Sequence, residues 1–135
     1  MKNIAIRENH LYQKAYRNGK RFVGQTVAVY VLRDYAAKRL KKENPEKQFV
    51  NRLGLSVSKK IGGAVERNRA KRIIRAAYDT QRHSLRTGFL IVISARGAIV
   101  GKKSTDVERE LRAAFDKLEL RVPPAAPAKD GQETQ

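Results

Sequence analysis

The strongest chemical signal in the sequence is a basic stretch, ERNRAKRIIR, which runs from Glu66 to Arg75. Residues 59–75 contain seven Lys or Arg side chains and one acidic side chain. Like charges at helical spacing repel one another, and guanidinium and ammonium groups bind phosphate oxygens well. A solvated helix face usually mixes both signs, so we favour phosphate binding over that alternative. The predicted phosphate-binding residues are Lys59, Lys60, Arg67, Asn68, Arg69, Lys71, Arg72 and Arg75.

Three tyrosines form a second candidate binding surface. Tyr12 and Tyr16 are four residues apart in a predicted helix, so they share one face of it. Tyr30 lies in a predicted strand. Facing an open sheet surface, such rings stack on single-stranded bases. The alternative is packing in the core with the hydroxyls at its rim, and the sequence leaves both interpretations open.

The composition points to an anionic partner. The chain has 135 residues, enough for one domain with a modest core, and a net charge of +17. Nucleic acid is the leading partner class, an anionic membrane surface the second, and solubility alone the third. The charge pattern is equally typical of RNA and DNA binding. The sequence shows no long apolar run and no signal-peptide core, so we expect no membrane span and a cytoplasmic location.

Catalytic side chains are missing from the pattern. There is no Cys, and two His residues are too few for a zinc cluster. We find no Ser-His-Asp arrangement, no Walker-type phosphate loop and no acidic cluster for a two-metal site. We therefore expect no catalytic residue in this protein and no metal ion bound directly by a cluster of its side chains.

The elements that must position these residues begin with a short helix. Asn9 is its expected N-cap, and Gly19 is its expected left-handed stop. The β-branched segment from Thr26 to Leu32 predicts a strand, and residues 37–47 predict a solvated hairpin loop. A further strand is expected from Phe49 to Lys59. Its predicted core face carries Leu53, Leu55 and Val57. Its other face is small, polar and basic, so it can meet water or a phosphate, and it carries Arg52, Gly54, Ser56, Ser58 and Lys60.

Residues 61–63 predict a turn before the basic helix, which is expected from Ala64 to about Gln81. On a helical wheel its inner side carries Ala70, Ile73, Ile74 and Ala77. Residues 88–94 predict a strand buried on both faces. A last helix should begin with Thr105 as N-cap and Glu108 completing a capping box. We predict one domain over residues 1–121, with helices packed on a mixed sheet, and a disordered tail over residues 122–135.

The segment GLSVSKKIGGAVERNRAKRIIRAAY, residues 54–78, resembles the signature of the protein component of bacterial ribonuclease P. LYQKAYRNGKRF and FLIVISARG are similar to the family's flanking blocks, so the resemblance covers residues 9–115. It implies an α/β (α+β) two-layer sandwich with a mixed sheet, in the order helix, three strands, helix, strand, helix. It also implies a left-handed strand–helix–strand crossover, against the usual preference.

The resemblance also implies a function. Such a subunit joins ribonuclease P RNA in the endonucleolytic removal of the 5′ leader from precursor tRNA, and the RNA with magnesium carries the chemistry. The helix residues Arg67 to Arg75 would contact that RNA and help to organise its metal ions. Lys59 and Lys60 would lie at the edge of the cleft or of the RNA. Tyr12, Tyr16 and Tyr30 would hold the leader in a cleft between the first helix and the sheet.

Two alternatives come from other functional classes. A structural RNA-binding protein shares the charge but would not stimulate tRNA cleavage. A membrane-surface protein would use polybasic attraction, although the large apolar residues are expected in the core. The resemblance further implies a protein that is monomeric apart from its RNA.

Overall fold

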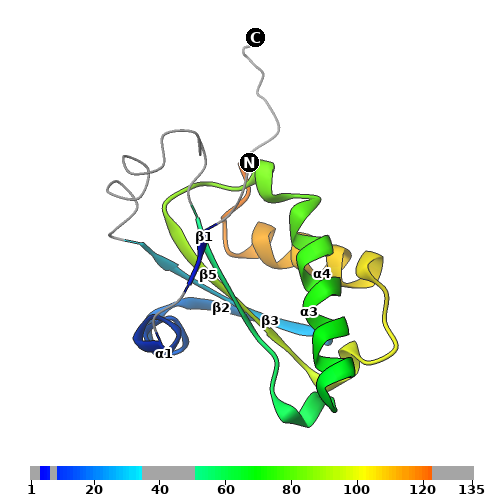
Figure 1. Cartoon of the computed structure of the whole chain (residues 1–135). Helices are drawn as coiled ribbons and strands as arrows, with labels where there is room; N and C mark the ends of the chain where they lie inside the picture. The colour runs from blue at the N-terminus through cyan, green and yellow to red at the C-terminus, as the bar shows by residue number, and fades with distance from the viewer. Residues whose placement is uncertain (1–3, 7–8, 35–50, 123–135) are drawn as a thin grey trace.

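The computed structural model describes residues 4–6, 9–34 and 51–122. They form a five-stranded mixed sheet with the strand order β1-β4-β5-β3-β2. Helix α1 lies on one face of the sheet, and α3 and α4 lie on the other (Figure 1). The elements are β1 (Ile4–Ala5), α1 (Asn9–Asn18), β2 (Lys20–Val23), β3 (Val27–Arg33), β4 (Arg52–Ser56), η1 (Lys59–Ile61), α3 (Ala64–Asp79), η2 (Arg82–Ser84), β5 (Phe89–Ala95), η3 (Gly97–Ile99) and α4 (Ser104–Lys117).

The predicted mixed α/β sandwich is confirmed. Strand β5 is central and pairs antiparallel with β3 and parallel with β4. Helix α3 therefore forms the crossover between two parallel strands, and this crossover is left-handed (Figure 1). Strand β1 was not predicted, because two residues are too short for a periodicity signal. It adds to the free edge of β4 in parallel orientation.

The larger core lies between the sheet and the helices α3 and α4. Its fully buried side chains include Tyr78 and Phe115, whose rings meet edge to face at 6.1 Å. The inner positions predicted for α3 are all buried. Leu53, Leu55 and Val57 pack against this core, as their alternation predicted. The apolar stripe of the last helix is also buried, at Val107, Leu111, Ala114 and Phe115.

Glycine at position 19 has a different role from the one expected. Its backbone is not left-handed, since the described glycines with positive φ are Gly62, Gly88 and Gly101. A β-carbon at residue 19 would lie 2.6 Å from the carbonyl oxygen of Ala15 and 2.9 Å from that of Val31. Glycine is therefore needed here because the chain passes closely between α1 and β3.

The polar face predicted for β4 is wrong at Arg52. Its guanidinium is buried and forms two hydrogen bonds with Asp34, Nε to Oδ2 at 2.7 Å and Nη2 to Oδ1 at 2.9 Å. Arg52 therefore joins two segments of the chain and does not face an external phosphate. The strand also ends earlier than predicted, at Ser56, so Lys59 lies in η1.

Element boundaries differ by one or two residues elsewhere. Asn9 is the first residue of α1 and not its cap, and α3 ends at Asp79. Helix α4 begins at Ser104, and the backbone N–H of Lys103 donates to Asp106 Oδ2 at 3.0 Å. The capping carboxylate therefore lies two residues before the predicted Glu108.

Some predictions lie outside the described residues, namely the hairpin loop at 37–47, the start of the strand at residues 49 and 50, and the tail from residue 123. The last described residue, Val122, donates its backbone N–H to the carbonyl of Ser84 at 2.7 Å. Among the described helices, none has the length and apolar character that crossing a membrane requires.

Candidate nucleic-acid interface

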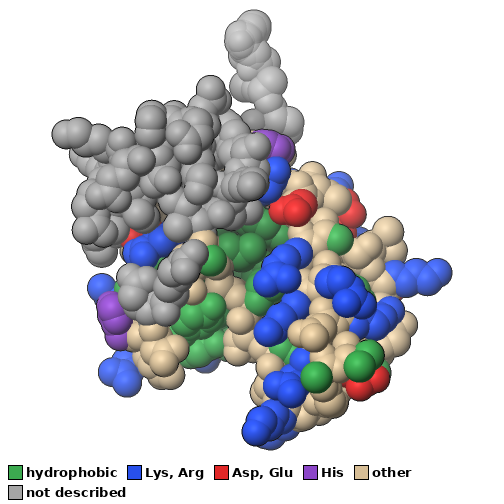
Figure 2. Space-filling model, in the orientation of Figure 1, with side chains coloured by type: hydrophobic (Ala, Val, Ile, Leu, Met, Phe, Trp, Pro, Cys, Tyr) green, Lys and Arg blue, Asp and Glu red, His purple; other side chains and the backbone are tan. Residues whose placement is uncertain are grey.

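The basic helix α3 carries its charges in three directions. Its buried side chains fix one side against the core. Lys71 and Arg75 border a groove beside strand β4, and Asn68 and Arg72 are exposed. Arg69 instead donates from Nη2 to the backbone carbonyl of Lys102 at 2.9 Å. The predicted phosphate-binding residues of α3 therefore point in different directions around the helix axis. Figure 2 shows Lys and Arg side chains, in blue, spread over this helix.

Two lysines add positive charge directly before the start of α3. Ile61 is buried in the main core and anchors η1, while Lys59 and Lys60 are exposed. Gly62 has a φ of 145°, a backbone conformation that residues with a side chain rarely adopt. Its N–H donates to the carbonyl of Lys59 at 3.2 Å. This turn lets the two lysines precede the helix with their ammonium groups in solvent.

Arg67 occupies an intermediate environment on α3. It is half-buried, and its Nε is buried with no hydrogen-bond partner among the described residues. Buried donors without a partner are uncommon in proteins.

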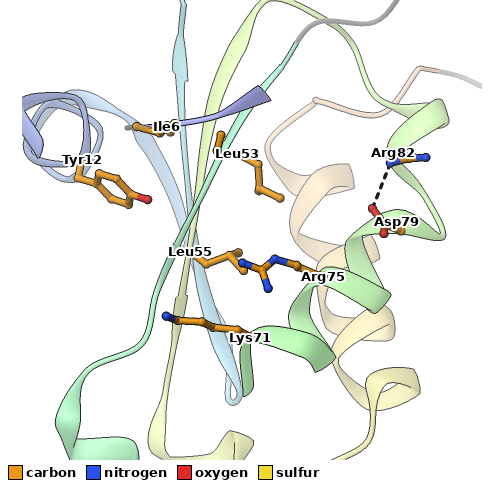
Figure 3. Close-up of a pocket in the computed structure, with 9 residues that line it drawn as sticks. Ile6, Tyr12, Leu53, Leu55, Lys71, Arg75, Asp79 and Arg82 are labelled. Atoms are coloured by element: carbon orange, nitrogen blue, oxygen red, sulfur yellow. Dashed lines mark hydrogen bonds and ion pairs between the residues drawn. The ribbon is translucent and has the colours of Figure 1, made fainter. Parts of the chain in front are cut away.

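A groove of about 330 Å³ lies between α1, the edge of β4 and α3. Ile6, Leu53 and Leu55 provide apolar lining. In Figure 3, Lys71 and Arg75 reach from α3 toward β4, and Tyr12 lies on the opposite side. Figure 2 shows the corresponding green hollow between the two helices. The complete lining is Ala5, Ile6, Tyr12, Leu53, Leu55, Lys71, Arg75, Asp79 and Arg82.

The three predicted tyrosines come together on the α1 side of the sheet. Tyr16 and Tyr30 meet edge to face with ring centroids 4.9 Å apart. All three are half-buried and pack against a small second core formed by Ile6, Ala15, Leu90 and Val92. We call Tyr12, Tyr16 and Tyr30 the tyrosine face. Each ring combines core packing with partial exposure, so the packing interpretation is confirmed in part and base stacking stays a prediction.

Tyr12 connects the tyrosine face to the groove. Its ring lies against Gly54, and it also lines the groove opposite Lys71. Burial raises the pKa of Tyr12, and nearby Tyr16 raises it further, while a hydrogen bond with the backbone of Leu55 partly opposes both. The phenol therefore stays neutral at physiological pH and keeps its hydrogen-bonding hydroxyl.

Several residues of this region were missing from the predicted site. Ala5 lies in β1 and Ile6 directly follows it, and this two-residue strand carries no pattern signal. Arg82 and Asp79 follow Lys71 and Arg75 along the same side of α3 and its C-terminal extension. Helical spacing of three and four residues was the available signal for them. Arg21, exposed on β2, pairs in register with Tyr30 and adds a cation beside the tyrosine face.

A protein site for magnesium needs one or more carboxylates together with water oxygens. Within residues 4–6, 9–34 and 51–122, no group of three or more His, Asp or Glu side chains is placed to hold a metal ion. The described residues therefore do not fit a metal site built from protein carboxylates.

Known proteins resemble this chain over most of its length. The sequence model of a family described as Ribonuclease P matches residues 1–119. A ribonuclease P protein component of Clostridium acetobutylicum is 37% identical over 120 residues, covering 89% of this chain and 92% of the relative. A relative from Thermoanaerobacter sp. is 31% identical over 119 residues, covering 88% of this chain and 92% of that protein.

Solved structures show the same fold. The structure of the Staphylococcus aureus RNase P protein superposes with a TM-score of 0.69 and 25% identity, covering 89% of this chain and 99% of that chain. The RNase P protein from Thermotoga maritima superposes with a TM-score of 0.64 at 20% identity, covering 81% of this chain and 92% of that chain.

Proposed function

The chain belongs to the ribonuclease P protein family, and from this premise we propose that its tyrosine face and groove bind the single-stranded 5′ leader of precursor tRNA. Ribonuclease P is the endoribonuclease of tRNA 5′ maturation, so this chain is a protein component of that enzyme and a partner of ribonuclease P RNA. The proposal concerns what its individual surfaces do within that assembly.

The observation that supports leader binding is the placement of Tyr12 opposite Lys71 and Arg75 in one groove (Figure 3). Single-stranded RNA offers bases that stack on aromatic rings and phosphates that bind cations, and a groove that combines both suits it. A regular duplex offers its base faces only at its ends. The arrangement therefore favours an unpaired strand over a helix.

The remaining basic residues of α3 suit a different part of the RNA. Asn68 and Arg72 are exposed away from the groove, and Lys59 and Lys60 extend this surface. We assign them to phosphates of ribonuclease P RNA. We assign the half-buried guanidinium of Arg67 to RNA as well, whereas Arg69 uses one donor on the carbonyl of Lys102 and keeps others for RNA.

The chemistry itself is assigned to the RNA. Magnesium would be held mainly by RNA oxygens, and the cations of α3 would lower the repulsion between phosphates that surround those ions. In this proposal the protein is a cytoplasmic monomer apart from its RNA. Its contributions are binding the leader and stabilising the folded RNA.

The experiment is cleavage of precursor tRNA at low magnesium by a bacterial ribonuclease P RNA, with and without this protein. We expect strong stimulation with correct 5′ ends. RNA binding without stimulation would contradict the proposal and favour a structural RNA-binding role. A precursor with a leader shortened to one nucleotide should lose most of the stimulation if the leader contact matters.

A further inference from the structure

Asp79 is an acidic residue in an otherwise cationic groove. It shares the groove with Lys71, Arg75 and Arg82, and its side chain is 56% exposed. One carboxylate oxygen, Oδ1, accepts from Arg82 Nη1 at 3.4 Å, which is a long contact. The other oxygen takes no part in that contact, so the carboxylate retains capacity to accept hydrogen bonds.

The position of Asp79 has no local advantage for the helix. It is the last residue of α3, where the helix dipole disfavours negative charge. Its exposed pairing with Arg82 is of a kind that contributes little to stability. The simplest role for Asp79 is to neutralise part of the charge of Arg82. That role does not explain why Asp79 lies in a groove with an apolar floor.

The charge of the side chains that line the groove therefore changes along its length. Lys71 and Arg75 are one turn apart on α3, and Asp79 and Arg82 continue toward its C-terminal end (Figure 3). A phosphate is attracted to Lys71 and Arg75 and repelled by Asp79. A nucleotide in this groove would thus place its phosphate near Lys71 and the edge of its base near Asp79.

The floor and the far end suit a base. Leu53, Leu55 and Ile6 offer apolar contact to a planar ring, with Tyr12 at the side. At the end of the groove, the Asp79 carboxylate is an acceptor and the Arg82 guanidinium is a donor. One Nη nitrogen of Arg82 contacts Asp79, and the second Nη nitrogen takes no part in that contact and keeps its donors.

We propose that the groove recognises one guanine of the leader, a proposal that rests on the leader-binding function above. Guanine presents two adjacent donors, N1–H and the N2 amino group, which match a carboxylate, and its O6 accepts from a neighbouring guanidinium. Adenine and cytosine lack the paired donors, and uracil has one. The volume of about 330 Å³ suits one nucleotide.

The test uses short single-stranded uridine oligoribonucleotides that carry guanosine, inosine or uridine at one central position. Inosine lacks the N2 amino group and retains O6 and N1–H. Dissociation constants measured by fluorescence anisotropy should show roughly tenfold tighter binding of the guanosine oligonucleotide than of the inosine one, the effect of one hydrogen bond to a charged group.

The variant Asp79→Asn should bring the guanosine-to-inosine affinity ratio to about one. Glu66→Gln is the matched control, because it removes one negative charge from the same helix and lies outside the groove. This control should keep the preference. Equal affinities of the wild type for both oligonucleotides, or equal loss of preference in both variants, would overturn the guanine site.

A final arm separates this proposal from the proposed function. Inosine replaces guanosine at one leader position at a time in precursor tRNA. The assembled holoenzyme should bind the precursor more weakly when one particular position is replaced. If no leader position responds while the oligonucleotides do, the leader assignment is overturned. If the protein stimulates cleavage but shows no guanine preference, the guanine site alone fails, whereas absent stimulation contradicts the proposed function.

Discussion

Tyr12 lies so closely over Gly54 that a β-carbon at residue 54 would be 2.6 Å from the phenolic oxygen. Gly54 is in β4 and is buried, and its neighbours across the sheet are Val92 and then Tyr30. The missing side chain at residue 54 therefore gives the Tyr12 ring its place between the tyrosine face and the groove.

Gly54→Ala should move the Tyr12 ring without removing it. The clash involves the end of a side chain that can rotate, so we expect a stability loss of about 1 kcal/mol, at the low end for added volume in a packed site. Leader affinity should fall several-fold. The measurements are urea denaturation and the affinity of the holoenzyme for precursor tRNA, and unchanged leader affinity would contradict the assigned position of Tyr12.

Replacing Tyr12 and Tyr16 together by Ala should weaken precursor tRNA binding by roughly tenfold or more, since each lost stacking contact contributes about 1–3 kcal/mol. Mature tRNA lacks the leader and should bind as before. Tyr12→Phe with Tyr16→Phe is the control, because it keeps the rings and the packing against the second core. An equal loss for precursor and mature tRNA would exclude a leader contact.

Lys71→Ala with Arg75→Ala should reduce the salt dependence of binding to a single-stranded leader oligonucleotide. Each lost phosphate contact lowers the log–log slope by roughly 0.7, so the double variant should lose about 1.4. Arg109→Ala with Arg112→Ala removes the same charge from α4, where both residues pair with acidic neighbours. That control should leave the slope unchanged, and a similar decrease in both would indicate a general charge effect.

Arg52→Met should destabilise the fold by about 3 kcal/mol, because it leaves the buried carboxylate of Asp34 without its guanidinium. Asp34 and Arg52 are 5% and 7% exposed, respectively. Arg109→Ala, which removes an exposed ion pair with Asp106, should cost less than about 1 kcal/mol. Urea denaturation of both variants checks this, and equal losses would refute a special role for the buried pair.

Asp106→Ala should lose stability in a pH-dependent way. The hydrogen bond from the backbone of Lys103 lowers the pKa of Asp106 below its ordinary value of 3.8, nearby cations lower it further, and slight desolvation opposes this. A lowered pKa in the folded state stabilises the protein above the unfolded-state pKa, and this contribution is lost as pH falls through the folded-state value. Wild type and variant should therefore converge in strong acid, and a constant difference across denaturation curves would contradict the cap.

The sequence by itself determined the features that depend on local periodicity. Ala70, Ile73 and Ile74 recur at helical spacing, so the buried side of α3 and the direction of its outward charges were predictable. Leu53 and Leu55 alternate in the same way along β4. The signature from Gly54 to Tyr78 pointed to the family, because it is a contiguous segment.

The tertiary structure decided which side chains meet. Arg52 was expected on a face that meets water or a phosphate, but the strand order places it beside Asp34, 18 residues away. Arg69 reaches the carbonyl of Lys102, 33 residues away. The groove joins Tyr12 of α1 to Arg75 of α3 across the edge of β4. Local periodicity fixes the face on which a side chain lies, whereas these partners depend on strand order and helix packing, which bring together residues far apart in the chain.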